Sequence, residues 1–233
     1  MQDWLAACRT VAHDAALAEE RERMGWMVHE DREPPLCYRW EHVRRVVGNA
    51  RWLLAQLPAD QEVVIAAAWL HDVKKGAKDH GALGAEFARE FLPTTDFPPD
   101  RIEAAADAIM KHVGLFRPAN DWSESEGAPF RPAPPLQPIE AAIVWDADKL
   151  SKVGPVGLVH FMFFELAALQ RRGESMTTEA FHEPNRRWLD TVAPRILMSF
   201  NTIAAQRKAF QLHAAYESFW LAEDEALRLG SES

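Results

Sequence analysis

The chain shows the hydrophobic periodicity of helices along most of its length. Apolar side chains recur three and four residues apart, and no stretch alternates apolar and polar residues as a half-buried strand does. The segments with this helical pattern are about 4–25, 38–57, 60–72, 80–91, 100–112, 139–150, 156–171, 177–191 and 194–228. The pattern therefore predicts an all-α fold.

Two of these helices start with a capping signal. Asp60 precedes the apolar run 63–70 and is suited to accept hydrogen bonds from the first backbone N–H groups of a helix. Asp100, followed by Glu103, matches the spacing of a capping box. We expect helices to begin at both positions.

Residues 115–138 interrupt the helical pattern. The segment is rich in proline and poor in aliphatic residues, which predicts a long irregular loop of the kind that often serves function. The histidine and aspartate residues that could bind a metal ion, described below, end near residue 150. We therefore expect an N-terminal helix and link (1–35), a catalytic core (36–154) that includes this loop, and a C-terminal helical extension (155–233) packed on the core.

The composition fits a protein with a large core and without a polyanionic partner. Of the 233 residues, 48% are hydrophobic and nine are tryptophan, which is enough apolar surface for a substantial helical domain. The formal net charge of -9 opposes binding to a nucleic-acid polymer, which needs a basic surface. A small phosphate ester stays open as a ligand, because bound metal ions can reverse the local field.

Nothing in the sequence predicts export or membrane insertion. The first residues lack the basic and then apolar profile of a signal peptide, and the longest apolar stretch, 156–169, is broken by His160 and Glu165. Cys8 and Cys37 form neither a disulfide framework nor a metal-binding CxxC pattern. We therefore expect a cytoplasmic protein with no membrane partner, and a homodimer remains open.

Histidine and aspartate stand where several helices would bring them together. His71 and Asp72 are adjacent and end the apolar run 63–70. Neighbouring residues on a helix point about 100° apart, so this pair could hold one ion only near a helix end or from neighbouring sides of a site. Further candidates on other predicted helices are His42, His80, His112, Asp146 and Asp148. Because first-row divalent metals prefer imidazole and carboxylate ligands, the pattern predicts an internal metal centre and hence an enzyme.

The order of these residues resembles that of the HD-domain superfamily of metal-dependent phosphohydrolases. The resemblance covers about 38–154 and is carried by His42, by HDVKK at 71–75, by KDHGALGAEFAREFL with His80, by AIMKHVG with His112, and by DADKL at 146–150. The order H…HD…H…H…D is that of the binuclear type, and its spacing is similar to that of bacterial dinucleoside tetraphosphate hydrolases. The proline-rich segment and the longer C-terminus depart from those enzymes and leave the substrate open.

The resemblance implies an HD-domain helical bundle, with extra C-terminal helices, that holds two divalent ions. The implied ligands are His42, His71, Asp72 and Asp148 for one ion and His80 and His112 for the second, with Asp72 bridging the two. Asp146 competes with Asp148, since only one of two residues two apart on a helix can face the site. The family's terminal aspartate aligns with Asp148. The metal stays open among Mn, Fe, Co, Ni and Zn.

The implied reaction is hydrolysis of a nucleotide or another small phosphate ester or anhydride, by attack of metal hydroxide on phosphorus. Asp72 and Lys75 are the expected catalytic residues, with Lys75 also binding substrate as a point cation. Weaker substrate-binding candidates are Arg45, Lys111 and Arg117. Two alternatives remain open: a di-iron HD-domain oxygenase with the same ligand order, and a non-catalytic nucleotide-binding protein.

Overall fold

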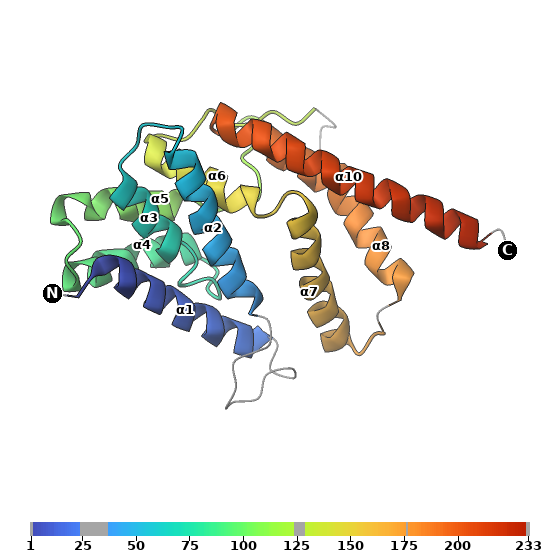
Figure 1. Ribbon diagram of the computed structural model, residues 1–233, viewed down its shortest axis with the longest axis horizontal. Helices are drawn as coiled ribbons and strands as arrows, with labels where there is room; N and C mark the ends of the chain where they lie inside the picture. The colour runs from blue at the N-terminus through green and yellow to red at the C-terminus, as the bar shows by residue number, and fades with distance from the viewer. Residues whose placement is uncertain (1, 24–36, 124–128, 176, 232–233) are drawn as a thin grey trace. The chain divides into compact units, whose positions relative to one another are not determined.

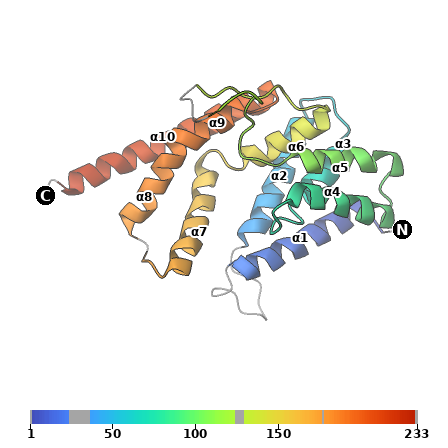
Figure 2. The same cartoon turned by 180° about the vertical axis from the view of Figure 1, so that it is seen from behind.

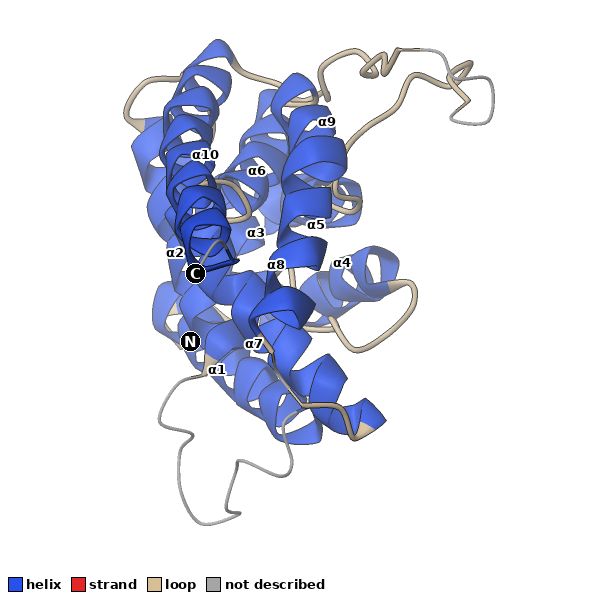
Figure 3. Cartoon of the chain, turned by 90° about the vertical axis from the view of Figure 1, so that its right-hand side faces the viewer, coloured by secondary structure: helices blue, strands red, loops and turns tan. Residues whose placement is uncertain are grey.

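The computed structural model describes residues 2–23, 37–123, 129–175 and 177–231 (Figure 1). Within these ranges the chain forms helices joined by loops and turns, without a strand (Figure 3). The α-helices are α1 (Trp4–Arg23), α2 (Tyr38–Leu54), α3 (Gln61–Leu70), α4 (His80–Phe91), α5 (Ile102–Lys111), α6 (Ile139–Leu150), α7 (Pro155–Arg172), α8 (Thr178–Arg187), α9 (Ala193–Met198) and α10 (Ile203–Ser231). The predicted all-α fold is confirmed.

The chain divides into two compact units. The first unit comprises Met1–Gly114 and Pro135–Asp148, and the second comprises Leu115–Pro134 and Lys149–Ser233. Part of the predicted core loop thus belongs to the second unit, and residues 124–128 of that loop, like residues 24–36 of the predicted N-terminal link, lie outside the described residues. None of the helices in the described part of the chain is both long enough and apolar enough to cross a membrane.

Helix α3 forms the centre of the first unit. Each of its residues from Val63 to Leu70 is buried, and α3 packs against α1, α2 and α5. Helices α4 and α5 lie side by side, as Figure 2 shows from behind. A helix that is apolar on all sides must be enclosed by other helices, so the uniformly apolar run 63–70 specifies this central position.

The two capping signals have different outcomes. The Asp60 carboxylate accepts hydrogen bonds from the backbone N–H groups of Glu62 and Val63, so the predicted cap is confirmed. The capping box at Asp100 is wrong, because Asp100 lies within a 3-10 turn that precedes α5. In that turn, the guanidinium of Arg101 donates to Asp60, and this contact ties the start of α5 to the start of α3.

The second unit has its own small core. Leu158 of α7, Leu189, and Tyr216 and Trp220 of α10 are buried against one another. The Tyr216 hydroxyl donates to Asn185 of α8 at 3.1 Å. These contacts connect three of the C-terminal helices through apolar packing and one buried hydrogen bond.

The single helix predicted over 194–228 is divided into α9 and α10. The division falls at 199–202, where polar side chains compete with the helical backbone. Ser199 donates to the carbonyl of Arg195, and the hydroxyl of Thr202 accepts from the N–H of Ala205. The periodicity of the apolar residues continues through this segment and therefore does not reveal the break.

Gly154 lies in the turn between α6 and α7, and its substitution tests the backbone conformation of that turn. Its φ is +86°, and a Cβ there would lie 2.8 Å from Cβ of Leu212 in the same unit. Gly154→Ala is therefore expected to lower the free energy of unfolding by roughly 2 to 3 kcal/mol, from the left-handed backbone and the steric overlap together. Gly173→Ala, with φ +70° but open space around it, should cost only about 1 kcal/mol. Equal urea-unfolding midpoints for the two variants would contradict this account.

Candidate metal centre

The sequence-predicted ligands converge within the first unit. His42 lies on α2, His71 and Asp72 directly follow α3, His80 begins α4, His112 follows α5 and Asp148 lies on α6. All of them are buried except His80, which is partly exposed. Because α3 ends at Leu70, the adjacent pair lies directly after a helix end, which is one of the two arrangements that the sequence allowed.

One group of potential metal-ligand atoms, from His42 and His71, lies around Oδ2 of Asp72. This oxygen lies 3.4 Å from Nε2 of His42 and 3.6 Å from Nε2 of His71, and the two imidazole nitrogens are 3.3 Å apart. Oδ1 of Asp148 lies 3.3 Å from the same nitrogen of His42. Donors that share a metal ion with bonds near 2.1 Å lie about 3 to 3.5 Å apart, so the spacing suits one divalent ion.

A second group gathers at Oδ1 of the same carboxylate. Nε2 of His112 lies 3.4 Å from Oδ1 of Asp72, and the rings of His80 and His112 have centroids 5.2 Å apart. Potential ligand atoms of Asp72, His80 and His112 all lie within 4.8 Å of one another, as do those of Asp72, His42 and His71. Asp72 therefore belongs to both groups.

The hydrogen bonds of two histidines show that the centre fits a cation. Nδ1 of His71 donates to the carbonyl of Ala68 at 2.8 Å, and Nδ1 of His112 donates to the carbonyl of Ile109. A neutral imidazole with a proton on Nδ1 carries a lone pair on Nε2. Both lone pairs therefore point toward the carboxylate of Asp72, an arrangement that is repulsive unless a cation lies between them. Metal-bound histidines in proteins show this same pattern.

Close helix packing brings the second group together. Gly81, next to His80, lies so near α5 that a Cβ at this position would be 3.1 Å from the carbonyl oxygen of Met110. Glycine thus permits the close approach of α4 to α5 that places His80 beside His112.

Hydrogen bonds to α6 hold Asp148 near the first group. The Asn49 side chain on α2 donates to the carbonyl of Ala147 at 3.0 Å, and Glu140 accepts from the backbone N–H of Asp60 at 2.9 Å. The contact between Asp148 and His42 supports Asp148 over Asp146, which is fully buried on the same helix, as the terminal ligand. The choice between them remains a prediction.

The predicted cationic residues occupy different places. The Lys75 ammonium lies 3.2 Å from Oδ1 of Asp72 and 3.3 Å from Nε2 of His80, within the centre. Lys111 donates to Asp107 and to the carbonyl of Gln137, contacts that hold its ammonium between α5 and the start of α6. Arg45 is half-buried on α2, and burial lowers its pKa.

Arg117 belongs to the second unit. Its guanidinium donates to the carbonyls of Pro134 and Ser199. Of the cations predicted to bind substrate, Lys75 thus has the strongest geometric support, and the other assignments stay predictions.

The sequence reasoning missed Arg39. Its side chain is 4% exposed, and Nη1 lies 3.5 Å from Oδ2 of Asp72. Arg39 stands three residues before His42, so helical spacing alone places it on the same side of α2. That spacing was the available signal.

Burial and neighbouring charges shift the pKa values in the centre in a direction that suits metal binding. Burial lowers the pKa of His71 from 6.5 to about 4. Burial alone would raise the pKa of Asp72, but the nearby charges of His71 and Lys75 outweigh it and hold that pKa well below 3.8. A neutral imidazole and an ionised carboxylate are the protonation states that bind cations.

Removal of metal should therefore expose a pH-dependent stability. Between pH 6.5 and pH 4 the unfolded chain binds a proton at His71 that the folded chain excludes, so stability falls as pH decreases through 6.5. We expect the metal-free protein to lose about 2 kcal/mol between pH 7 and pH 5. Asp72 adds nothing in this window, because its contribution is lost only below pH 3.8. Urea unfolding at the two pH values measures the difference, and equal stabilities would contradict it.

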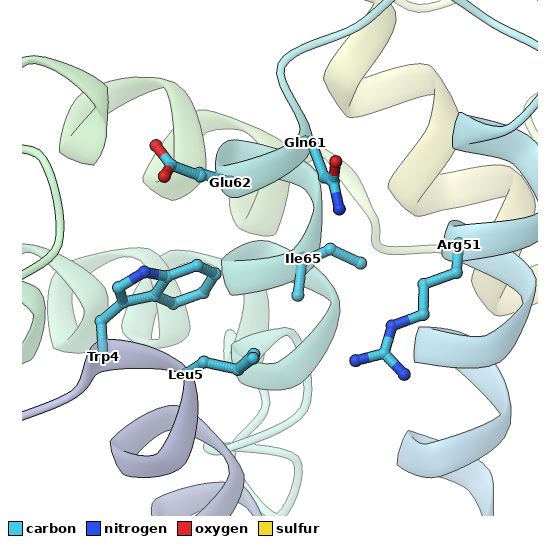
Figure 4. A pocket seen from close by; sticks show the side chains of 6 residues that line it. All are labelled: Trp4, Leu5, Arg51, Gln61, Glu62 and Ile65. Atoms are coloured by element: carbon cyan, nitrogen blue, oxygen red, sulfur yellow. The ribbon is translucent and has the colours of Figure 1, made fainter.

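A surface pocket of the first unit lies apart from these residues. It has a volume of about 300 Å³ and is lined by Trp4, Leu5, Arg51, Gln61, Glu62 and Ile65 (Figure 4). None of the lining residues is a candidate ligand. Glu62 in this pocket is paired with Arg101, and none of the described residues that line the pocket is a histidine.

Solved structures share the fold at low sequence identity. A predicted HD superfamily hydrolase from an uncultured Thermotogales bacterium is 20% identical, with a TM-score of 0.57 and coverage of 96% of this chain and 94% of that one. Bacillus subtilis YpgQ in complex with ADP is also 20% identical, with a TM-score of 0.57 and coverage of 92% and 97%. An HD-superfamily hydrolase from Bacillus thuringiensis is 18% identical, with a TM-score of 0.58 and coverage of 91% and 98%.

The family comparison covers the segment that holds the metal centre. Residues 39–152 match the family model described as the HD domain, and this segment includes each candidate ligand from His42 to Asp148. No curated protein matches the chain in sequence. The helical fold, the position of the family match and the convergence of histidine and aspartate agree, and residues 39–152 of the chain form a domain of the HD-domain superfamily.

Proposed function

We propose that this chain is a metal-dependent phosphohydrolase that acts on a nucleotide or another small phosphate ester or anhydride. The observation that carries the proposal is the position of Asp72. Its Oδ2 faces one group of potential ligand atoms and its Oδ1 faces the other, so a single buried carboxylate could serve two cation sites. Paired metal sites of this kind recur among enzymes that cleave phosphate esters.

The proposed ligands divide between two ions. His42, His71, Asp72 and Asp148 would hold the first ion, and His80 and His112, with Asp72, would hold the second. Divalent ions bound in this way supply a water molecule of lowered pKa as the nucleophile and neutralise phosphoryl oxygens. The chain itself keeps His71 neutral through burial, so that its Nε2 lone pair stays available for binding.

Lys75 is the residue best placed to meet the substrate. Its side chain is 26% exposed while its ammonium reaches Oδ1 of Asp72, so the cation lies between the buried carboxylate and the solvent. A phosphoryl group that enters from solvent would meet this charge as it reaches the carboxylate, and the ammonium would stabilise negative charge that develops on the phosphoryl oxygens.

The nucleotide part of the proposal has support from one structural neighbour. Bacillus subtilis YpgQ, with the same fold at 20% identity, is known in complex with ADP. The formal net charge of -9 is unfavourable for binding a polyanion, which makes a small phosphorylated metabolite the better substrate class. A cytoplasmic location remains a prediction.

A phosphate-release screen tests this function. A chelator first removes metal from the full chain, which is then reloaded with Mn²⁺, Fe²⁺, Co²⁺, Ni²⁺ or Zn²⁺. Each sample is incubated with nucleoside mono-, di- and triphosphates and with dinucleoside polyphosphates. We expect phosphate or pyrophosphate release that depends on the metal. Full metal loading without release from any substrate would contradict the proposal, and oxygen uptake by an iron-loaded sample would favour the oxygenase instead.

A further inference from the structure

Arg39 connects the metal centre to helix α1. On one side, Nη1 of Arg39 lies 3.5 Å from Oδ2 of Asp72. On the other side, Nε donates to Oε1 of Glu19 at 3.0 Å. The side chains of Arg39 and Asp72 are 4% and 2% exposed, and that of Glu19 is 12% exposed. The guanidinium is therefore held between two carboxylates and shielded from solvent.

Helix α1 fixes the backbone of Arg39 as well as its side chain. Oε2 of Glu20, which is buried, accepts a hydrogen bond from the backbone N–H of Arg39 at 3.1 Å. This N–H belongs to the first turn of α2, where backbone donors have no partner within the helix. Two consecutive glutamates of α1 thus anchor the start of α2 and the guanidinium that projects from it.

Stability alone is a weak reason for this arrangement. Burying charged groups costs several kcal/mol per ion, and replacing a buried ion pair with apolar residues often leaves a protein equally stable. The guanidinium offers something that an apolar group or an ammonium lacks: a rigid planar fork whose N–H directions are fixed relative to one another. A fork held at Nε by Glu19 has a defined direction at Nη1, where Asp72 lies.

We propose that Arg39 is a positioning residue for the metal centre, and that α1 orients the Asp72 carboxylate through Glu19, Glu20 and this guanidinium. Arg39 holds Oδ2 at the group formed by His42 and His71, and this leaves Oδ1 directed at His112. The inference rests on the proposed function, since it concerns the same metal centre. Helix α1 lies before the segment matched by the family model. Under this proposal, α1 contributes to the geometry of the metal centre.

The choice of substitution matters because Arg39 acts in two opposite ways. Its positive charge repels a bound cation, whereas its fixed orientation of Asp72 favours cation binding. Arg39→Gln would change both effects at once. Arg39→Lys keeps the charge and removes only the fork, so the change in affinity that it causes reports on positioning. Glu19→Ala removes the acceptor of the Nε hydrogen bond and leaves Arg39 in place.

The test is a titration of the metal-free full chain with Mn²⁺, followed by electron paramagnetic resonance. We expect Arg39→Lys to raise the Kd for Mn²⁺ by about 10- to 100-fold, as for other residues that orient a metal ligand, and to change the spectrum of the bound ion. Glu19→Ala should act in the same direction with a smaller effect. The matched control is Arg44→Lys, which makes the same substitution at an exposed arginine of α2 that pairs with Glu41.

Each outcome has a separate meaning. Wild-type Kd and spectrum in Arg39→Lys would overturn the positioning role while the metal centre itself stands. Wild-type behaviour of Glu19→Ala beside an impaired Arg39→Lys would overturn the part assigned to α1. Absence of Mn²⁺ binding in the wild type would overturn the proposed function together with this inference. An affinity loss in Arg44→Lys equal to that in Arg39→Lys would show a general charge or stability effect and would also overturn the inference.

Discussion

Asp72→Ala is expected to remove the bound metal and to lower the rate of phosphate release by about a thousandfold or more. The reason is that Asp72 is the one carboxylate shared by both donor groups, so its loss weakens both cation sites at once. Metal-ion catalysis contributes several kcal/mol to such reactions, and each 1.36 kcal/mol corresponds to a factor of ten in rate. Elemental analysis and a phosphate-release assay on the same preparation measure the two effects.

Two further variants make the result on Asp72 interpretable. Asp72→Asn has nearly the same shape but no charge, so it should also lose metal while it preserves packing between Arg39 and Lys75. Glu103→Ala removes an exposed carboxylate that pairs with Arg89 in the same unit and should leave metal content and rate unchanged. Wild-type activity in Asp72→Asn would contradict a catalytic metal centre at this position.

The second large effect is expected at the end of α6. Asp148→Asn should weaken binding of the first ion by more than about 100-fold, because it removes a carboxylate ligand rather than a group that merely orients one. Asp146→Asn, two residues away on the same helix, should change the affinity far less. Both aspartates are buried, so the pair controls for the cost of altering a buried carboxylate. Calorimetric titration with Mn²⁺ compares them, and the reverse order of effects would identify Asp146 as the ligand.

Much of the helical fold could be predicted because the apolar pattern is strong where a helix is central. The run 63–70 gives a helix that is buried on every side, and the Asp60 cap fixes where it begins. The sequence also indicated that His71 and Asp72 must lie at a helix end in order to share an ion, and α3 ends at Leu70. In these places, local propensity and packing favour the same structure.

Local patterns were less informative where side chains far apart in sequence compete for the same group. Asp100 was expected to cap a helix, but Arg101 turns to Asp60, 41 residues away, and the chain forms a 3-10 turn instead. The break between α9 and α10 depends on hydroxyl groups that bond to the backbone, which leave the apolar period unchanged.

The candidate site shows the same distinction. Histidine and aspartate are recognisable as candidate ligands from residue type and order alone. The role of Arg39 depends on contacts with α1 and with the turn after α3, and the sequence does not show these contacts. Lys111 and Lys75 both looked suited to bind phosphate, and only their hydrogen bonds separate them: Lys111 bonds to Asp107, whereas Lys75 reaches Asp72.

The metal content of the purified full chain tests the central claim most directly. Two donor groups that share Asp72 predict one tightly bound transition-metal ion per chain, and a second ion when the metal is supplied in excess. Elemental analysis by mass spectrometry, before and after loading with Mn²⁺, gives both numbers. A chain that contains no transition metal and takes up none on loading would contradict the account.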